Sequence, residues 1–317
     1  MSITVNRITK TYGAQTALSE VTFTVNSGEI VGFIGPNGAG KSTMMKIICA
    51  LLTPDSGSVK VNGCDASSHS LEIKRKLGYL PENNPLYSDM YVEEYLRYVA
   101  GIYQPRRKSG SRVREIIGIT GLHPEKNKKI AALSRGYRQR VGLAQAIIHE
   151  PEVLILDEPT SGLDPNQILE IRNLISHLGK EKTVILSTHI MQEVEAICKR
   201  VIIINKGKII ANDLAENIGG YSISPSRTIV VEFKQDPDQK IFTGITGMEQ
   251  VRNLKPGTWL IQTSGETDIR ADLFNLAVKH KLIILSLHQK EKKLEDVFRE
   301  LTLPDNTCLL YTSPSPR

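Results

Sequence analysis

The chain has 317 residues, of which 40% are hydrophobic, and a formal net charge of +6. This composition excludes a disordered chain and favours about two folded domains. The longest apolar runs fall short of the roughly 18 residues that span a bilayer, so we expect no membrane-spanning helix. The charge is modest and the basic clusters contain no interleaved aromatic residues, so we expect no nucleic-acid partner.

The start of the chain and its few cysteines both predict a location in the reducing cytosol. Residues 1–6 lack the charged start and apolar core of a secretory signal, which predicts a cytosolic chain. The four cysteines share no metal-ligand spacing. In a reducing compartment we expect no disulfide framework.

A glycine-rich loop follows the first expected strands. Residues 3–8 and 21–25 alternate apolar with polar side chains, which predicts half-buried antiparallel strands. A buried strand at 30–34 leads into the loop, and a helix beginning near Met44 leaves it. The loop consists of Gly35, Pro36, Asn37, Gly38, Ala39, Gly40, Lys41, Ser42 and Thr43.

The loop has the residues and the context of a phosphate-binding P-loop. Its backbone N–H groups and the start of the next helix converge on one anion. Lys41 reaches the β- and γ-phosphates, and the Ser42 hydroxyl can bind Mg²⁺. We therefore predict a site for a nucleoside triphosphate with its metal. The alternative is a glycine-rich turn without a ligand.

Two residues outside the loop are candidates for the same site. Tyr12 precedes the loop and either stacks on a nucleotide base or is an ordinary partly buried tyrosine, which the local sequence favours. Glu82 stands at the exit of a strand expected at 77–80. The following region, 83–130, is predicted to be an inserted helical subdomain with a polar break at 106–111.

The next candidates lie at a helix start and at a strand end. Ser134 opens a helix, where its hydroxyl either caps the helix or helps to hold a phosphate. Four apolar residues at 153–156 then end in Asp157 and Glu158. A central parallel strand needs no acids at its end for stability. We assign metal ligation to Asp157 and polarisation of water to Glu158.

A second buried strand brings a histidine to the same edge. A helix expected at 166–178 precedes the strand 183–187, after which comes His189. This histidine is either structural or acts at the γ-phosphate. The alternation of strands and helices predicts a mainly parallel sheet with helices on both faces, in a first domain of residues 1–215.

The rest of the chain is built differently. After the apolar strand 201–204 we expect a polar connection, whose part at 216–227 is the linker between domains. Residues 228–303 predict a small α+β domain. Its expected elements are strands at 228–233, 258–263 and 282–289 and helices at 268–279 and 293–301. Back-translated, the last ten residues resemble a sequencing adapter read in frame, so 304–317 is interpreted as an artefact or a disordered tail.

In order, these motifs resemble those of an ABC transporter ATPase over almost all of residues 1–215. They match its Walker A loop, signature motif, Walker B strand, D-loop and switch histidine, at Gly35–Thr43, Leu133–Tyr137, Val153–Glu158, Ser161–Asp164 and His189. Three stretches look most like the ATP-binding subunit of the gliding-motility-associated ABC transporter, namely Leu80–Tyr87, Leu133–Arg140 and Leu294–Arg299. The fold implied is an ABC-type P-loop α/β domain with a parallel central sheet, an antiparallel β subdomain and a helical subdomain.

The resemblance also implies a reaction and partners. Tyr12 would stack on adenine, and Ser134 and Gly136 would face the γ-phosphate across a head-to-tail homodimer. Glu158 would act on water during ATP hydrolysis, with Mg²⁺ as cofactor. Closure and reopening of the dimer would drive export by separate transmembrane permease subunits, which would contact the surface around residues 82–91. The chain would then be peripheral on the inner face of the cell membrane.

Two departures from the family pattern stand out. Glu82 replaces the usual glutamine and adds negative charge near the metal, and Arg135 and Tyr137 alter the common signature while leaving Ser134 and Gly136 intact. A soluble ABC ATPase acting on nucleic acid or ribosomes is the main alternative. One P-loop and no long coiled-coil insertion argue against it, and the presence of Glu158 argues against a regulator without turnover.

Overall fold

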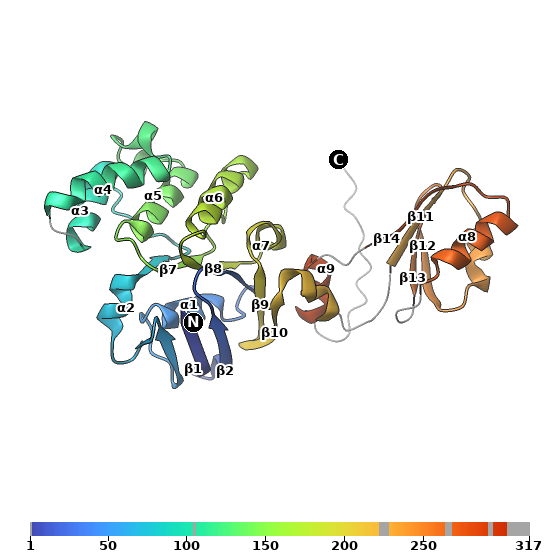
Figure 1. The fold of residues 1–317 in the computed structure, drawn as a ribbon, viewed down its shortest axis with the longest axis horizontal. Coiled ribbons are helices and arrows are strands. Elements are labelled where there is room, and N and C mark those ends of the chain that lie inside the picture. The colour runs from blue at the N-terminus through green and yellow to red at the C-terminus, as the bar shows by residue number, and fades with distance from the viewer. Residues whose placement is uncertain (1, 104–105, 222–227, 264–267, 291–293, 303–317) are drawn as a thin grey trace. The chain divides into compact units, whose positions relative to one another are not determined.

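The computed structural model describes residues 2–103, 106–221, 228–263, 268–290 and 294–302. The chain divides into two compact units, Met1–Asn217 and Ile218–Arg317. Figure 1 traces both along the chain, and each is described by itself. Within the described residues, no helix combines the length and the apolar character that crossing a membrane requires.

A six-stranded sheet forms the centre of the first unit, in the order β10-β9-β3-β8-β7-β6. Five neighbouring strands are parallel, and β10 pairs antiparallel with β9. Every residue of β7 and β8 is buried, as expected when both faces of a parallel sheet are covered. The strands are β3 (Ile30–Ile34), β6 (Leu77–Leu80), β7 (Val153–Asp157), β8 (Thr183–Thr188), β9 (Arg200–Asn205) and β10 (Lys208–Leu214).

A second, antiparallel sheet carries the start of the chain. Its order is β2-β1-β4-β5, and it shares a hydrophobic core with the central sheet, in which the Phe23 and Phe33 rings lie 5.6 Å apart. Helix α1 (Lys41–Ile48) contributes buried residues to this core. The strands are β1 (Ile3–Tyr12), β2 (Gln15–Val25), β4 (Ser56–Val61) and β5 (Cys64–Asp65).

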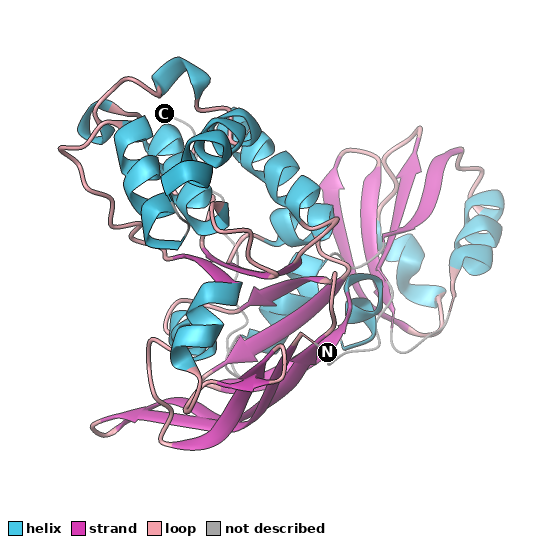
Figure 2. Cartoon of the chain, turned by 60° about the vertical axis from the view of Figure 1, so that its left-hand side comes forward, coloured by secondary structure: helices cyan, strands magenta, loops and turns pink. Residues whose placement is uncertain are grey.

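Helices make up the rest of the unit, and Figure 2 shows a group of them set apart from the antiparallel strands. The polar break expected at 106–111 is wrong, because α4 begins at Arg106 and runs through this segment. Its apolar side chains come later, where Val113, Ile116 and Ile117 are buried. The helices are α2 (Ser70–Lys76), α3 (Val92–Tyr103), α4 (Arg106–Ile119), α5 (Arg135–Ile147), α6 (Pro165–Leu178) and α7 (Met191–Ile197), with 3-10 turns at His123–Glu125 and Ile130–Ala132.

The segment after β9 also differs from the expectation of a polar connection. Strand β10 turns back on β9 through a hairpin in which Lys206 and Gly207 both have positive φ, 47° and 75°. Such a turn matches the twist of the strands it joins. A 3-10 helix, η3 (Ala215–Tyr221), occupies the first part of the linker predicted at 216–227, and residues 222–227 lie outside the described residues.

The second unit is an antiparallel sheet in the order β12-β13-β11-β14. Phe242 and Trp259 lie 5.1 Å apart in its core, against Leu273 of α8. Strand β12 and the turn η4 were not anticipated, and the tail 304–317 lies outside the described residues. The elements are β11 (Thr228–Phe233), η4 (Gln239–Gly244), β12 (Met248–Lys255), β13 (Thr258–Thr263), α8 (Arg270–Lys279), β14 (Ile284–Lys290) and α9 (Leu294–Thr302). The predicted α/β class with its subdomains and α+β appendage is confirmed.

Candidate active site

The P-loop joins β3 to α1, as predicted from the sequence. At Gly40 the backbone has φ 107°, and a Cβ there would lie 2.5 Å from the Ala17 carbonyl oxygen. A Cβ at Gly35 would lie 2.4 Å from the Ile204 carbonyl oxygen. Glycine is therefore required at both positions because the neighbouring backbone passes too close for any side chain.

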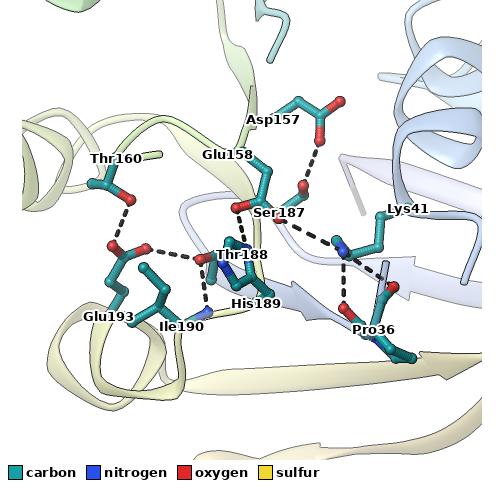
Figure 3. Close-up of polar contacts among 11 residues, drawn as sticks. Pro36, Lys41, Asp157, Glu158, Thr160, Ser187, Thr188, His189, Ile190 and Glu193 are labelled. Atoms are coloured by element: carbon teal, nitrogen blue, oxygen red, sulfur yellow. Dashed lines mark hydrogen bonds and ion pairs between the residues drawn. The ribbon is translucent and has the colours of Figure 1, made fainter. Parts of the chain in front are cut away.

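Lys41 begins α1 and is only 7% exposed. Its Nζ donates to the Gly35 carbonyl at 2.8 Å and to the Pro36 carbonyl at 3.4 Å, and it lies 3.6 Å from Glu158 Oε1 (Figure 3). The ammonium group is thus held by the loop's own backbone beside an acid at the end of β7. This compact positive charge could bind phosphate oxygens in place of the two carbonyl oxygens.

Glu158 and His189 meet, although 31 residues separate them along the chain. Glu158 Oε2 and His189 Nδ1 are 2.8 Å apart, within hydrogen-bonding distance. Because β7 and β8 are adjacent and parallel, the residues that follow their ends lie at the same edge of the sheet. Glu158 is 6% exposed, whereas the His189 side chain is 49% exposed.

The backbone of Glu158 has an unusual conformation. Its φ is 51°, in the left-handed region that non-glycine residues rarely adopt, and this costs on the order of 1–3 kcal/mol. The Glu158 N–H donates to the Ser187 carbonyl at 3.0 Å, which ties this residue to the neighbouring strand. Such outliers persist when surrounding structure fixes them, and they gather at functional sites.

Asp157 lies in the sheet below this edge and is 1% exposed. Its Oδ1 accepts a hydrogen bond from the Ser187 hydroxyl at 2.5 Å. The negative charge of Asp157 adds to burial in raising the pKa of Tyr79 and the pKa of the Cys49 thiol well above their usual ranges. The negative charge of Asp157 therefore acts on neighbouring groups within the core.

Candidate residues from five segments of the chain line one cleft of about 570 Å³. Tyr12 stands on its wall with 51% of its surface exposed, so it is not the partly buried tyrosine that the local sequence favoured. Gln15 and Ala17, which belong to no motif found in the sequence, also line it, as does Ser161 at the start of the D-loop match. The other lining residues are Asn37, Gly38, Gly40, Lys41, Ser42, Thr43, Glu82, Glu158 and His189.

Comparisons with known proteins agree with this geometry. The family model described as ABC transporter matches residues 18–161. The uncharacterized ABC transporter ATP-binding protein YdbJ of Bacillus subtilis is 32% identical over 295 residues, which cover 92% of each chain. The bacitracin transport ATP-binding protein BcrA of Bacillus licheniformis is 33% identical over 300 residues, covering 93% of this chain and 95% of BcrA. The chain belongs to the ABC transporter ATP-binding proteins.

Solved structures of the family share the fold. A dimeric, post-hydrolysis ATP-binding cassette MJ0796 bound to ADP and Pi has a TM-score of 0.63 and 26% identity, over 67% of this chain and 98% of that chain. The ATP-binding subunit of an ABC transporter gives the same TM-score with 32% identity, over 69% and 92%. The first unit is therefore an ABC ATPase domain, and the chain is an ATPase that binds ATP.

The donor groups in the cleft of this ABC ATPase fit Mg²⁺. Ser42 and Glu82 provide a hydroxyl and a carboxylate on the cleft wall, and Asp157 lies beneath it. All three are hard oxygen donors, the type that Mg²⁺ prefers. Among the described residues, no group of three or more His, Cys, Asp or Glu side chains could hold a metal by itself. This donor set suits a metal that also takes oxygens from phosphates and water.

The signature motif lies elsewhere on the ABC domain. Ser134 is the N-cap of α5, and its hydroxyl accepts from the Tyr137 N–H at 3.3 Å. A Cβ at Gly136 would lie 2.6 Å from the terminal amide of Gln167 on α6, so the two helices pack closely at this glycine. Neither Ser134 nor Gly136 lines the cleft of its own chain.

Proposed function

We propose that this ABC ATPase is the ATP-hydrolysing subunit of an export-type transporter that drives separate permease subunits from the cytoplasmic face of the membrane. The observation that carries the proposal is the position of Glu158, 3.6 Å from Lys41 and 2.8 Å from His189 at the edge of the P-loop cleft. A carboxylate at this place polarises the water that attacks the γ-phosphate.

The other residues of the cleft divide the remaining work. The P-loop N–H groups and Lys41 neutralise the phosphate charge, and Tyr12 offers a ring to the adenine base. We assign direct contact with Mg²⁺ to Ser42 and Glu82. Asp157 does not line the cleft, so we propose that it orients the groups that contact the metal. When bound, the metal would neutralise charge on the phosphate oxygens.

The signature residues suggest how the site is completed. Ser134 and Gly136 lie outside the cleft of their own chain, so they are available to a partner. The structure of MJ0796 bound to ADP and Pi is described as dimeric. We infer that two copies of this chain meet head to tail, with each ATP between Lys41 of one copy and Ser134 of the other.

A groove of about 490 Å³ is the proposed docking surface for the permease. Tyr87, Tyr98 and Ile102 line it and are 56%, 49% and 64% exposed. Apolar grooves of this kind bind the apolar face of a short helix. The segment 81–84 links the two sites, because Glu82 lines the ATP cleft while Pro81 and Asn84 line the groove.

The relatives bear on the kind of cargo. BcrA is a bacitracin transport protein, and the linearmycin resistance ATP-binding protein LnrL of Bacillus subtilis is 32% identical over 307 residues, covering 93% of this chain and 96% of LnrL. The names of these relatives favour export of antibiotic-like compounds. The gliding-motility type inferred from three sequence stretches stays a prediction, and these relatives point away from it.

Co-purification tests the proposal. The full chain carrying Glu158→Gln is expected to retain ATP and to hold its partners, so it is isolated from detergent-solubilised membranes with ATP and Mg²⁺. We expect a polytopic membrane protein to accompany it, and Ile102→Asp in the groove to abolish this association. Leu71→Asp, at another exposed apolar residue outside the groove, is the matched control. Recovery of ribosomes or nucleic acid instead would support the soluble ABC ATPase.

A further inference from the structure

Glu193 is a buried acid that the proposed reaction does not use. It lies in the first turn of α7 and is 1% exposed. Its Oε1 accepts the Thr160 hydroxyl at 2.5 Å, and its Oε2 accepts the Thr188 hydroxyl at 2.9 Å (Figure 3). Within the described residues, the carboxylate pairs with these two hydroxyls and with no cation.

Capping of the helix does not explain this acid. A glutamate in the first turn commonly accepts the N–H of the N-cap residue. Here the N-cap is Ile190, and its N–H donates to the Thr188 hydroxyl oxygen at 3.1 Å instead. The carboxylate of Glu193 is occupied by Thr160 and Thr188.

Stability of the core does not call for an acid either. A buried carboxylate is unfavourable unless it is hydrogen-bonded, and an apolar side chain of similar size avoids the cost of burial. What a carboxylate adds is the ability to accept from two hydroxyls at once, in charge-assisted bonds. The Thr188 hydroxyl accepts from Ile190, so its proton is free to be donated to Glu193.

The two threonines flank the residues assigned to hydrolysis. Thr160 is two residues after Glu158, and Thr188 immediately precedes His189. Since Glu158 and His189 share a hydrogen bond of 2.8 Å, the contacts close a ring through Glu158, Thr160, Glu193, Thr188 and His189. Figure 3 shows Glu193 on the side of this ring away from Lys41.

We propose that Glu193 is a positioning residue for ATP hydrolysis. It fixes the spacing between the segment after β7 and the segment after β8, and through them the direction of the Glu158 carboxylate. This inference rests on the proposed roles of Glu158 and His189. The left-handed backbone of Glu158 needs neighbouring structure to fix it, and a displacement of about 1 Å is enough to slow a reaction by roughly a hundredfold.

The first experiment compares two substitutions in the full chain. Glu193→Leu should lower kcat for ATP by roughly 10–100-fold and change KM by less than about threefold, because the P-loop is untouched. Glu193→Gln should keep kcat within about fivefold of wild type, because an amide can accept from one threonine and donate to the other. Nucleotide binding and the melting temperature are measured on each variant.

A second pair of variants separates positioning from a general loss of buried hydrogen bonds. Thr160→Val removes one hydroxyl from Glu193 and should lower kcat in the same direction as Glu193→Leu. Thr120→Val is the matched control, because the fully buried Thr120 donates its hydroxyl to the Ile116 carbonyl at 2.7 Å, in the helical subdomain. We expect this control to leave kcat within about twofold of wild type.

The decisive step repeats Glu193→Leu in the Glu158→Gln background. If Glu193 acts through Glu158, the second substitution should lower the residual rate by less than about twofold. The same fold loss in both backgrounds, or a Glu193→Leu chain with kcat within twofold of wild type, would overturn the inference. If Glu193→Leu does not fold, unchanged kcat in Thr160→Val overturns it. Near-normal turnover by Glu158→Gln alone would refute the proposed function instead.

Discussion

Glu158 Oε2 lies 2.8 Å from His189 Nδ1, while the other oxygen of the same carboxylate lies 3.6 Å from Lys41 Nζ. One buried acid therefore links the P-loop to the segment after β8. In the proposed mechanism, this carboxylate lies beside the phosphate bound at Lys41, and His189 orients it toward the attacking water. Substitutions of Glu158 and Lys41 should therefore separate the loss of turnover from the loss of ATP binding.

Glu158→Gln should retain ATP and lose most of its hydrolysis. The amide keeps the shape of the side chain but cannot serve as a base, and a loss on the order of 10²–10⁴-fold is typical of a positioned acid or base. Equilibrium binding of ATP and steady-state phosphate release measure the two properties. Near-normal phosphate release would remove Glu158 from its assigned role.

Lys41→Ala should weaken ATP binding itself. The substitution removes the charge that the P-loop backbone holds at 2.8 Å from the Gly35 carbonyl, where the phosphates are expected. Lys46→Ala is the control, because Lys46 is in the same helix but exposed. Titration with ATP should show a rise in Kd for Lys41→Ala only. An equal change in both variants would mean that only the overall charge matters.

The P-loop could be predicted because its chemistry is local, although α1 begins at Lys41 and not near Met44 as expected. Strand, glycines, lysine and helix follow one another between residues 30 and 48, so no long-range contact was needed. The carboxyl ends that bear Glu158 and His189 were also predictable, since buried strands end there. That β7 and β8 are neighbours was not, because strand order depends on how the whole sheet packs.

Other features had no signal in the sequence. Glu193 has the sequence pattern of an ordinary glutamate in a first helical turn, and only tertiary contacts with Thr160 and Thr188 distinguish it. Helix α2 is short and polar with one buried residue, Ile73, so its pattern is weak. Strand β12 is largely exposed and is defined by its pairing with β13.

Glu82→Gln should change the dependence of hydrolysis on Mg²⁺. Glu82 lines the same cleft as Ser42, which places its carboxylate among the candidate metal donors. An amide oxygen still binds Mg²⁺ but carries no charge, so ATP binding should persist while the Mg²⁺ concentration for half-maximal rate shifts. A Glu94→Gln variant, outside the cleft, controls for removal of an acid. An unchanged Mg²⁺ dependence would make Glu82 a surface acid.

Phe242→Ala should destabilise the second unit selectively. Phe242 is fully buried against Phe233 and Trp259, and truncating such a ring costs about 3–5 kcal/mol. If the two units fold independently, as we propose, the fluorescence of Trp259 will report unfolding at lower denaturant while ATP still binds to the first unit. Loss of both signals together would show that the units unfold as one.

The shared-site proposal depends on Ser134, which caps α5 outside the cleft of its own chain. In a head-to-tail dimer of one Lys41→Ala chain and one Ser134→Arg chain, one site combines intact Lys41 with intact Ser134. The other site carries both defects. Mixing two inactive chains should therefore restore part of the hydrolysis.

A site built within a single chain predicts no recovery in this mixture. If each chain built a complete site from its own Lys41 and Ser134, every site in the mixture would carry one defect, and mixing would restore nothing. Tagging the two variants differently confirms that mixed dimers form. The second control is a mixed dimer of one wild-type chain and one chain carrying both substitutions, isolated through both tags so that wild-type homodimers do not contribute. This dimer has no intact shared site, but it has one intact site if each chain acts alone. Hydrolysis by the first mixture and not by the control identifies a site built from two chains.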